Sequence, residues 1–147
     1  IEEPIPGFDL SASWALARDL RTPICLDESL TSHRVVRDAI RYESCGVFCI
    51  KPGRLGGIRA AIRALDEVAT AGLRAFVGGM HETGLARAAL GVLSTHEACQ
   101  LVSDVVAPQT YLDNDPCGLP GPSGGFQPLY ASPGIGPWPD RSQLSAI

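Results

Sequence analysis

The sequence lacks several features that would assign it to a common class at once. No apolar stretch approaches the roughly 20 residues of a membrane-spanning helix, so no membrane segment is expected within the chain. There is no long run of lysine or arginine, and the 147 residues carry a net charge of −4; nucleic acid is therefore not expected to be the main partner. With 45% hydrophobic and 19% charged residues, the composition indicates a folded globular chain.

The cysteines and glycines also fall short of the usual binding motifs. Of the five cysteines, Cys45 and Cys49 stand four apart, but no second pair completes the spacing of a structural zinc site. An odd number of widely spaced cysteines favours free thiols in a reducing compartment, which indicates a cytoplasmic protein. The glycine-rich turn after Lys51 lacks both G-K-[ST] and G-x-G-x-x-G, which argues against a phosphate loop. A tight turn between a strand and a helix accounts for these glycines better.

The sequence contains instead a repeated unit, an apolar run followed by a helix. The apolar runs are residues 23–27, 46–51, 73–79 and 99–104. Short apolar runs that alternate with helices are typical of parallel strands covered on both faces. Two of the helices are expected to bury an apolar stripe: Ile58, Ile62, Leu65 and Val68 in one, and Leu85, Ala88, Ala89 and Val92 in the other.

The residues at which the runs stop recur at a regular interval. They are Glu2, Asp27, Lys51, Gly79 and Asp104, about 25 residues apart, close to the roughly 30 residues per unit of a (β/α)₈ barrel. A doubly wound sheet could give the same spacing, and polar residues resume at the end of any strand. An acid, an acid and a lysine in three successive units favour the barrel, whose active sites lie on that rim. Five units do not close an eight-stranded barrel, so the others are expected upstream of Ile1 or on another chain.

Three of these rim residues predict a reaction. Glu2 and Asp27 would lie on adjacent strand ends, and paired carboxylates suit Mg²⁺ or Mn²⁺. Lys51 follows one strand further round, where partial desolvation would lower its pKa enough to move a proton near neutral pH. A metal ion would stabilise the negative oxygen formed when a proton leaves a carbon next to a carboxylate. The three groups therefore predict proton abstraction α to a carboxylate.

Four motifs in this order, "IEEP", "TPICLDES", "IKPGRLGG" and "VGGMHETGLARAA", strongly resemble the enolase superfamily. Within it they are similar to the o-succinylbenzoate synthase and N-acylamino acid racemase group. The resemblance implies an α/β fold, in which residues 1–112 form the C-terminal part of a TIM-type (β/α)₇β barrel, from the end of strand 4 to strand 8. It also implies that the Pro/Gly-rich residues 113–147, with "SPGIG" at 132–136, pack near a capping domain.

The same resemblance implies roles for individual residues. Glu2 and Asp27 match metal-ligand carboxylates, and Lys51 matches an acid/base lysine. The loop after the seventh strand would line the substrate pocket through Gly78, Gly79, Met80 and Glu82. Neighbouring polar residues are expected to support the site or to bridge elements of the barrel: Glu3, Glu28, Arg54 and Arg87.

The implied activity is divalent-metal-dependent o-succinylbenzoate synthesis, a dehydration that serves menaquinone biosynthesis, N-succinylamino acid racemisation, or both, through a metal-stabilised enolate. The substrate would be a small carboxylate. A third carboxylate ligand, a second lysine, the N-terminal half of the barrel and the capping domain are not in this chain, so the chain alone is expected to be inactive. Alternatives are a dipeptide epimerase, a cycloisomerase or an inactive partial barrel, and a homo-oligomer is left open.

Overall fold

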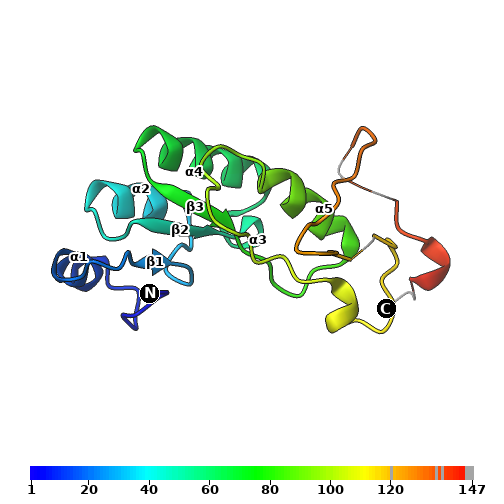
Figure 1. Cartoon of the computed structure of the whole chain (residues 1–147), viewed down its shortest axis with the longest axis horizontal. Helices are drawn as coiled ribbons and strands as arrows, with labels where there is room; N and C mark the ends of the chain where they lie inside the picture. The colour runs from blue at the N-terminus through cyan, green and yellow to red at the C-terminus, as the bar shows by residue number, and fades with distance from the viewer. Residues whose placement is uncertain (120, 135, 137, 145–147) are drawn as a thin grey trace.

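The chain folds around one parallel sheet, as seen in a computed structural model that describes residues 1–119, 121–134, 136 and 138–144. Within that part of the chain the sheet has three strands in the order β1 (Cys25–Leu26), β2 (Val47–Ile50) and β3 (Arg74–Val77) (Figure 1). In the register, Cys25 pairs with Val47 and Val47 pairs with Arg74. Each strand lies within a predicted apolar run, so the predicted parallel arrangement is confirmed.

Isolated parallel bridges extend the sheet at both edges. Glu2 pairs with Cys25 beyond β1, while Cys99 and Asp104 pair with Ala75 and Gly78 beyond β3. The predicted strand over 99–104 therefore touches β3 only near its two ends, and Val102 between them is 93% exposed. A side chain replaces part of the ladder here, because the Ser103 hydroxyl accepts the amide hydrogen of Val77 at 3.1 Å.

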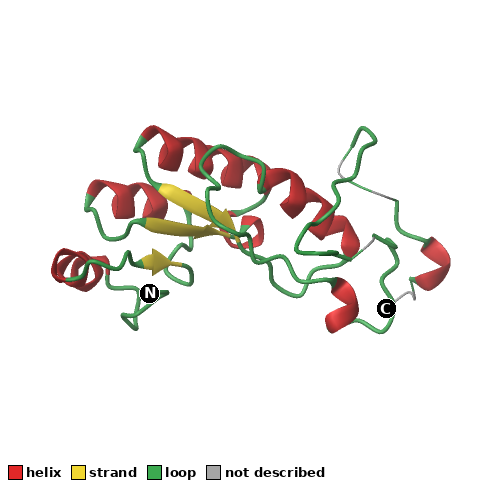
Figure 2. Cartoon of the chain, viewed as in Figure 1, coloured by secondary structure: helices red, strands yellow, loops and turns green. Residues whose placement is uncertain are grey.

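The helices follow the strand ends in the predicted order (Figure 2). The bounds are α1 Leu10–Asp19, α2 His33–Arg41, α3 Pro52–Leu55, α4 Ile58–Thr70 and α5 Gly84–Leu93, with 3₁₀ turns η1 Pro108–Thr110 and η2 Arg141–Gln143. Asp9 caps α1 by accepting from the amides of Ser11 and Ala12, both at 2.9 Å. Such caps satisfy amides that have no partner within the helix and set where it begins.

The turn after Lys51 contains a one-turn helix that the sequence did not predict. Pro52 opens α3, where its missing N–H is no loss, and Gly56 ends it with φ of 94°. Gly57 follows with φ of 117°. Both values lie in the region that favours glycine, which agrees with the interpretation of these glycines as a tight turn.

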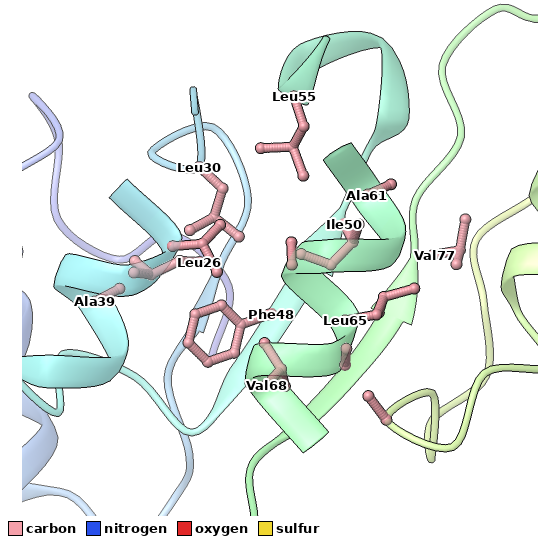
Figure 3. Packing of buried hydrophobic residues seen from close by; sticks show 14 of the residues in the cluster. Leu26, Leu30, Ala39, Phe48, Ile50, Leu55, Ala61, Leu65, Val68 and Val77 are labelled. Carbon is pink, nitrogen blue, oxygen red and sulfur yellow. The ribbon is translucent and has the colours of Figure 1, made fainter. Parts of the chain in front are cut away.

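One face of the sheet packs against α2 and α4 and forms the main core (Figure 3). Phe48 and Ile50 of β2 meet Leu65 and Val68 of α4, and all four are fully buried. Burying each such side chain contributes roughly 1.5–3 kcal/mol. Alternate residues point to the other face, where Cys25, Val47 and Cys49 form a smaller cluster. All five cysteines are free, as predicted.

The two predicted helical stripes were right only in part, because Leu65, Val68 and Ala88 are buried as predicted whereas other members of the stripes are exposed. Ile58 and Ile62 are 38% and 40% exposed, and Val92 is 54% exposed. The face that α4 presents to the sheet consists largely of alanines, with Leu65 and Val68: Ala60, Ala61, Ala64, Leu65 and Val68. In α5 the buried set includes a charged side chain, Arg87, together with Ala88, Leu90 and Leu93.

The C-terminal segment runs alongside α5 (Figure 1). Arg87 donates from Nη2 to the carbonyl of Leu119 at 3.2 Å, which explains why a charged residue is buried in α5. The division into 1–112 and 113–147 stays a prediction, as does packing of the tail near a capping domain. Residues 120, 135, 137 and 145–147, which include part of the predicted 132–136 signature, lie outside the described residues. None of the helices described is both long and apolar enough to cross a membrane.

Candidate active site

Asp27 and Lys51 meet at the carboxyl ends of β1 and β2. Asp27 follows β1 directly and is 3% exposed, and Lys51 follows β2 directly. The Nζ of Lys51 lies 2.5 Å from Asp27 Oδ2. Arg54 donates from Nη1 to the other carboxylate oxygen and to the carbonyl of Asp27, both at 2.7 Å. The Asp27 carboxylate is thus held between two cations.

The one-turn helix α3 explains how both cations reach one carboxylate. The carbonyl of Lys51 accepts from the amide of Arg54 at 3.0 Å. This single turn brings the side chain three positions along the chain back over its starting point. Arg54 is therefore a partner of the site, which agrees with its predicted bridging role, although its exact partner was not predicted.

Glu3 supports Asp27 from the neighbouring chain segment. Its Oε2 accepts from the Asp27 amide at 2.7 Å, and its other oxygen accepts from the Ser29 hydroxyl. Glu3 has φ of 38°, a conformation that is unfavourable for a residue with a Cβ. These contacts agree with the supporting role expected of Glu3, whereas Glu28 is exposed.

The pKa of Lys51 lies above its ordinary value of 10.5. Burial by itself would lower this pKa, but the hydrogen bond to Asp27 and the nearby charges of Cys49 and Asp27 outweigh it. The lowered pKa expected from the sequence is therefore not found, because the carboxylate stabilises the ammonium form.

Glu2 and Asp27 offer carboxylate oxygens of the kind that Mg²⁺ and Mn²⁺ prefer. The backbone bridge of Glu2 to Cys25 puts the two acids on neighbouring strand ends, as predicted. Among the described residues no group of three His, Cys, Asp or Glu side chains is gathered closely enough to hold a metal ion. The donor chemistry of these two acids thus suits part of a divalent-metal site.

Gly78 makes room for Lys51. A Cβ at this position would lie 2.6 Å from Lys51 Cε and 2.4 Å from Cys49 Sγ, closer than real Cβ contacts allow. The lysine side chain therefore runs across the face of Gly78 on its way to Asp27. This contact links the loop after β3 to the Lys51–Asp27 pair.

The rest of that loop borders a cleft of about 380 Å³, whose lining includes Gly79, Met80, His81, Asp104, Val106, Thr110 and Tyr111. Gly79 and Met80 line this cleft, whereas Gly78 and Glu82 are not among its lining residues. That the loop binds substrate stays a prediction. Both oxygens of Glu82 accept from the amide of Met80 at 2.6 Å, so Glu82 holds the loop. Tyr111 was not predicted, since no spacing rule connects it to the strand ends.

Lys51 is also the only lysine in the sequence, beside eleven arginines. Arginine stays charged in proteins, whereas lysine can lose its proton when its surroundings change. The single lysine therefore occupies the strand end at which the reaction would need a proton donor or acceptor. The amino-acid composition alone could have singled out Lys51.

Two curated relatives resemble the whole chain. It is 40% identical over 150 residues to N-succinylamino acid racemase from Amycolatopsis sp., covering 100% of this chain and 40% of that protein. It is 37% identical over 148 residues to o-succinylbenzoate synthase from Geobacillus stearothermophilus, covering 98% and 39%. The chain thus spans about two fifths of the length of these relatives.

The fold and the family agree with these relatives. The crystal structure of an unknown member of the enolase superfamily from Enterococcus faecalis V583 superimposes with a TM-score of 0.89 at 28% identity, covering 97% of this chain and 39% of that one. This confirms the predicted fold class, the C-terminal part of an enolase-superfamily barrel with parallel strands alternating with helices. A family model, enolase C-terminal domain-like, matches residues 1–143. The chain therefore belongs to the enolase C-terminal domain-like family.

Proposed function

We propose that this chain is the C-terminal part of a divalent-metal-dependent enzyme that removes a proton from the carbon next to a substrate carboxylate. The proposal rests on the contact between Lys51 and Asp27, which places an amine that can gain or lose a proton beside a carboxylate, a side chain that commonly binds metal ions. The relatives named N-succinylamino acid racemase and o-succinylbenzoate synthase support racemisation, dehydration, or both as the reactions.

Asp27 and Glu2 would hold the metal ion together with ligands from outside this chain. When bound, Mg²⁺ or Mn²⁺ would offset the negative charge that develops on the substrate carboxylate as the proton leaves. Arg54 and Glu3 fix the orientation of Asp27 through its side chain, carbonyl and amide. Side chains held in this way do not have to reorganise during the reaction. The absence of this reorganisation cost is the reason why preorganised sites react faster.

Lys51 would move the proton through Nζ. Near neutral pH its contact with Asp27 holds it as an ammonium ion, the form that gives a proton to an enolate carbon. To accept a proton, Lys51 must first lose its own. If another group replaced Nζ at Asp27 Oδ2, the pKa of Lys51 would fall and the neutral amine would form more readily. In a racemase a second base on the opposite face of the carbon would complete the exchange.

The rest of the machinery would come from other parts of the protein. The N-terminal half of the barrel and a capping domain would supply the remaining ligand and the second lysine, so the chain alone would be inactive. If dehydration is the main reaction, the product would serve menaquinone biosynthesis. A cytoplasmic location and a homo-oligomer stay predictions.

The test uses the complete protein that carries this chain, with Mg²⁺ present. O-succinylbenzoate formation and N-succinylamino acid racemisation are measured side by side, then repeated after the metal is removed with a chelator. We expect at least one activity, its loss on chelation and its return when Mg²⁺ is restored. Activity only on dipeptides or only in ring closure would favour an epimerase or a cycloisomerase. Inactivity on every substrate class would favour a barrel with no catalytic role.

A further inference from the structure

Residues 104–115 contact the loop after β3 and the start of α5 at several points in succession. The amide of Gly79 donates to the carbonyl of Asp104 at 2.6 Å. The Tyr111 hydroxyl donates to the carbonyl of Glu82, and the Tyr111 ring lies 4.9 Å from the ring of His81. The loop that borders the cleft is therefore held by contacts with Asp104 and Tyr111 as well as by its own hydrogen bonds.

The last of these contacts is made by Asp115. Thr83 occupies the N-cap position of α5, but its side chain makes no capping hydrogen bond. Both oxygens of Asp115 instead accept from the amide of Gly84, at 3.0 and 3.1 Å. A carboxylate 31 residues away in the chain thus takes over the work of an N-cap, where negative charge also complements the helix dipole.

Gly84 is shaped for this contact. A Cβ there would lie 2.4 Å from Asp115 Oδ2 and 3.1 Å from Cys117 Cβ, so a larger residue would push the carboxylate away. Asp115 also accepts from the amide of Cys117 at 3.2 Å, which fixes its own backbone. Both Gly84 and Asp115 are therefore arranged to favour the hydrogen bond between them.

Residues 79–82 connect the cleft to the start of α5. Glu82 lies two residues before Gly84, and its carboxylate accepts from the amide of Met80. Met80 and Gly79 line the cleft. Any movement at the start of α5 would thus shift Glu82 and, through it, the two cleft residues.

We propose that Asp115 is a positioning residue for substrate binding: by capping α5 it sets the conformation of residues 79–82 and hence substrate affinity and choice. The inference rests on the proposed function, since it assigns the cleft to the substrate. Lys51 is held by Asp27 and passes Gly78, which precedes residues 79–82, so we expect the proton-transfer step to depend little on Asp115. Asp115 acts on binding and leaves the chemistry unchanged.

The test compares Asp115→Asn and Asp115→Ala with Asp113→Asn in the complete protein. Asp113 is an exposed aspartate two positions away, so its change removes the same charge without touching α5. Hydrogen exchange at the amides of residues 80–84 is measured first. It is expected to be about fivefold faster in Asp115→Ala, from the usual worth of an N-cap, less so in Asp115→Asn, and unchanged in Asp113→Asn.

Kinetics give the second readout. KM is expected to rise severalfold for Asp115→Ala, with kcat within about twofold of the native value, and the ratio of racemisation to dehydration should change. Tyr111→Phe, which removes only the hydroxyl contact with Glu82, should shift KM in the same direction by less. Thermal unfolding followed by circular dichroism checks that each variant is folded.

Two results would overturn the inference: native exchange rates at residues 80–84 in a folded Asp115→Ala variant, or a fall in kcat with KM unchanged. A native protein that is inactive on every substrate class would instead refute the proposed function. The exchange experiment would still decide whether Asp115 holds the loop.

Discussion

The Nζ of Lys51 lies 2.5 Å from Oδ2 of Asp27, across the carboxyl ends of two neighbouring strands. Their side chains are 14% and 4% exposed, so water screens the pair little. Arg54 binds the other oxygen of the same carboxylate at 2.7 Å. One buried carboxylate thus contacts two cations, and several consequences of this arrangement can be measured.

Replacing Asp27 with Asn should destabilise the complete protein by about 3 kcal/mol, because removal of one partner leaves buried charges unpaired. Urea unfolding measures the change. Asp38→Asn is the matched control, since Asp38 makes a salt bridge with the exposed Arg34 at 3.6 Å and should contribute under about 0.5 kcal/mol. Equal effects of the two changes would mean that the Asp27 cluster is not a buried unit.

The Lys51–Asp27 pair also predicts how stability depends on pH. The pKa of Lys51 is raised above 10.5 in the folded protein, so folding binds the proton more tightly than the unfolded chain does. The stabilisation is fully present below pH 10.5 and is lost as pH rises through the higher folded value. The difference in unfolding free energy between the native protein and Lys51→Met should be constant near neutral pH and shrink in alkali. A difference that grows with pH would contradict the pairing.

Gly78→Ala should disturb Lys51 without adding any charge. The new Cβ would overlap Cys49 Sγ and Lys51 Cε, so Nζ would move, and a displacement of about 1 Å can reduce turnover roughly 100-fold. Gly53→Ala is the control, because nothing lies within 4 Å of its Cβ position and alanine suits a helix. Steady-state kinetics of the two variants should therefore differ widely. Similar rates would show that Lys51 does not need the space at Gly78.

The buried thiols should be nearly inert to alkylation. Burial, reinforced by the charges of Glu2 and Asp27, raises the pKa of Cys25 to about 12, and burial raises the pKa of Cys45 to about 12. Since the thiolate is the reactive form, both should react with iodoacetamide at least about 100-fold more slowly in the folded protein than in urea. Mass spectrometry of digested samples gives the rate at each site. Rapid labelling of Cys25 in the folded protein would show that this face of the sheet opens.

The strand ends could be predicted from the sequence because they depend on local patterns. One apolar run stops at Asp27 and the next stops at Lys51, which predicts two successive strands. Because parallel strands end at the same edge of a sheet, the two residues were expected to lie close together. The helical faces were harder to predict, because small residues make part of the contact. The sequence pattern placed Leu65 and Val68 correctly on the buried face of α4, but it also favoured Ile58 and Ile62, whereas the other buried positions are alanines.

The contacts that join distant segments were not predicted. No periodicity connects Asp115 to Gly84 or Tyr111 to Glu82, because these pairs depend on the path of the C-terminal segment. The expected fall in the pKa of Lys51 follows from desolvation alone, whereas the fold also places the Asp27 carboxylate against Nζ. In the fold the partner outweighs burial.

Lys51→Arg in the complete protein tests the central claim most directly. Arginine can keep a cation beside Asp27, but it does not release a proton near neutral pH. Exchange of the α-hydrogen with solvent deuterium is measured by NMR for each enantiomer of an N-succinylamino acid. The account predicts that the exchange of one enantiomer falls at least about 1,000-fold while the other is retained through the second base. Native exchange of both enantiomers in the Lys51→Arg protein would contradict it.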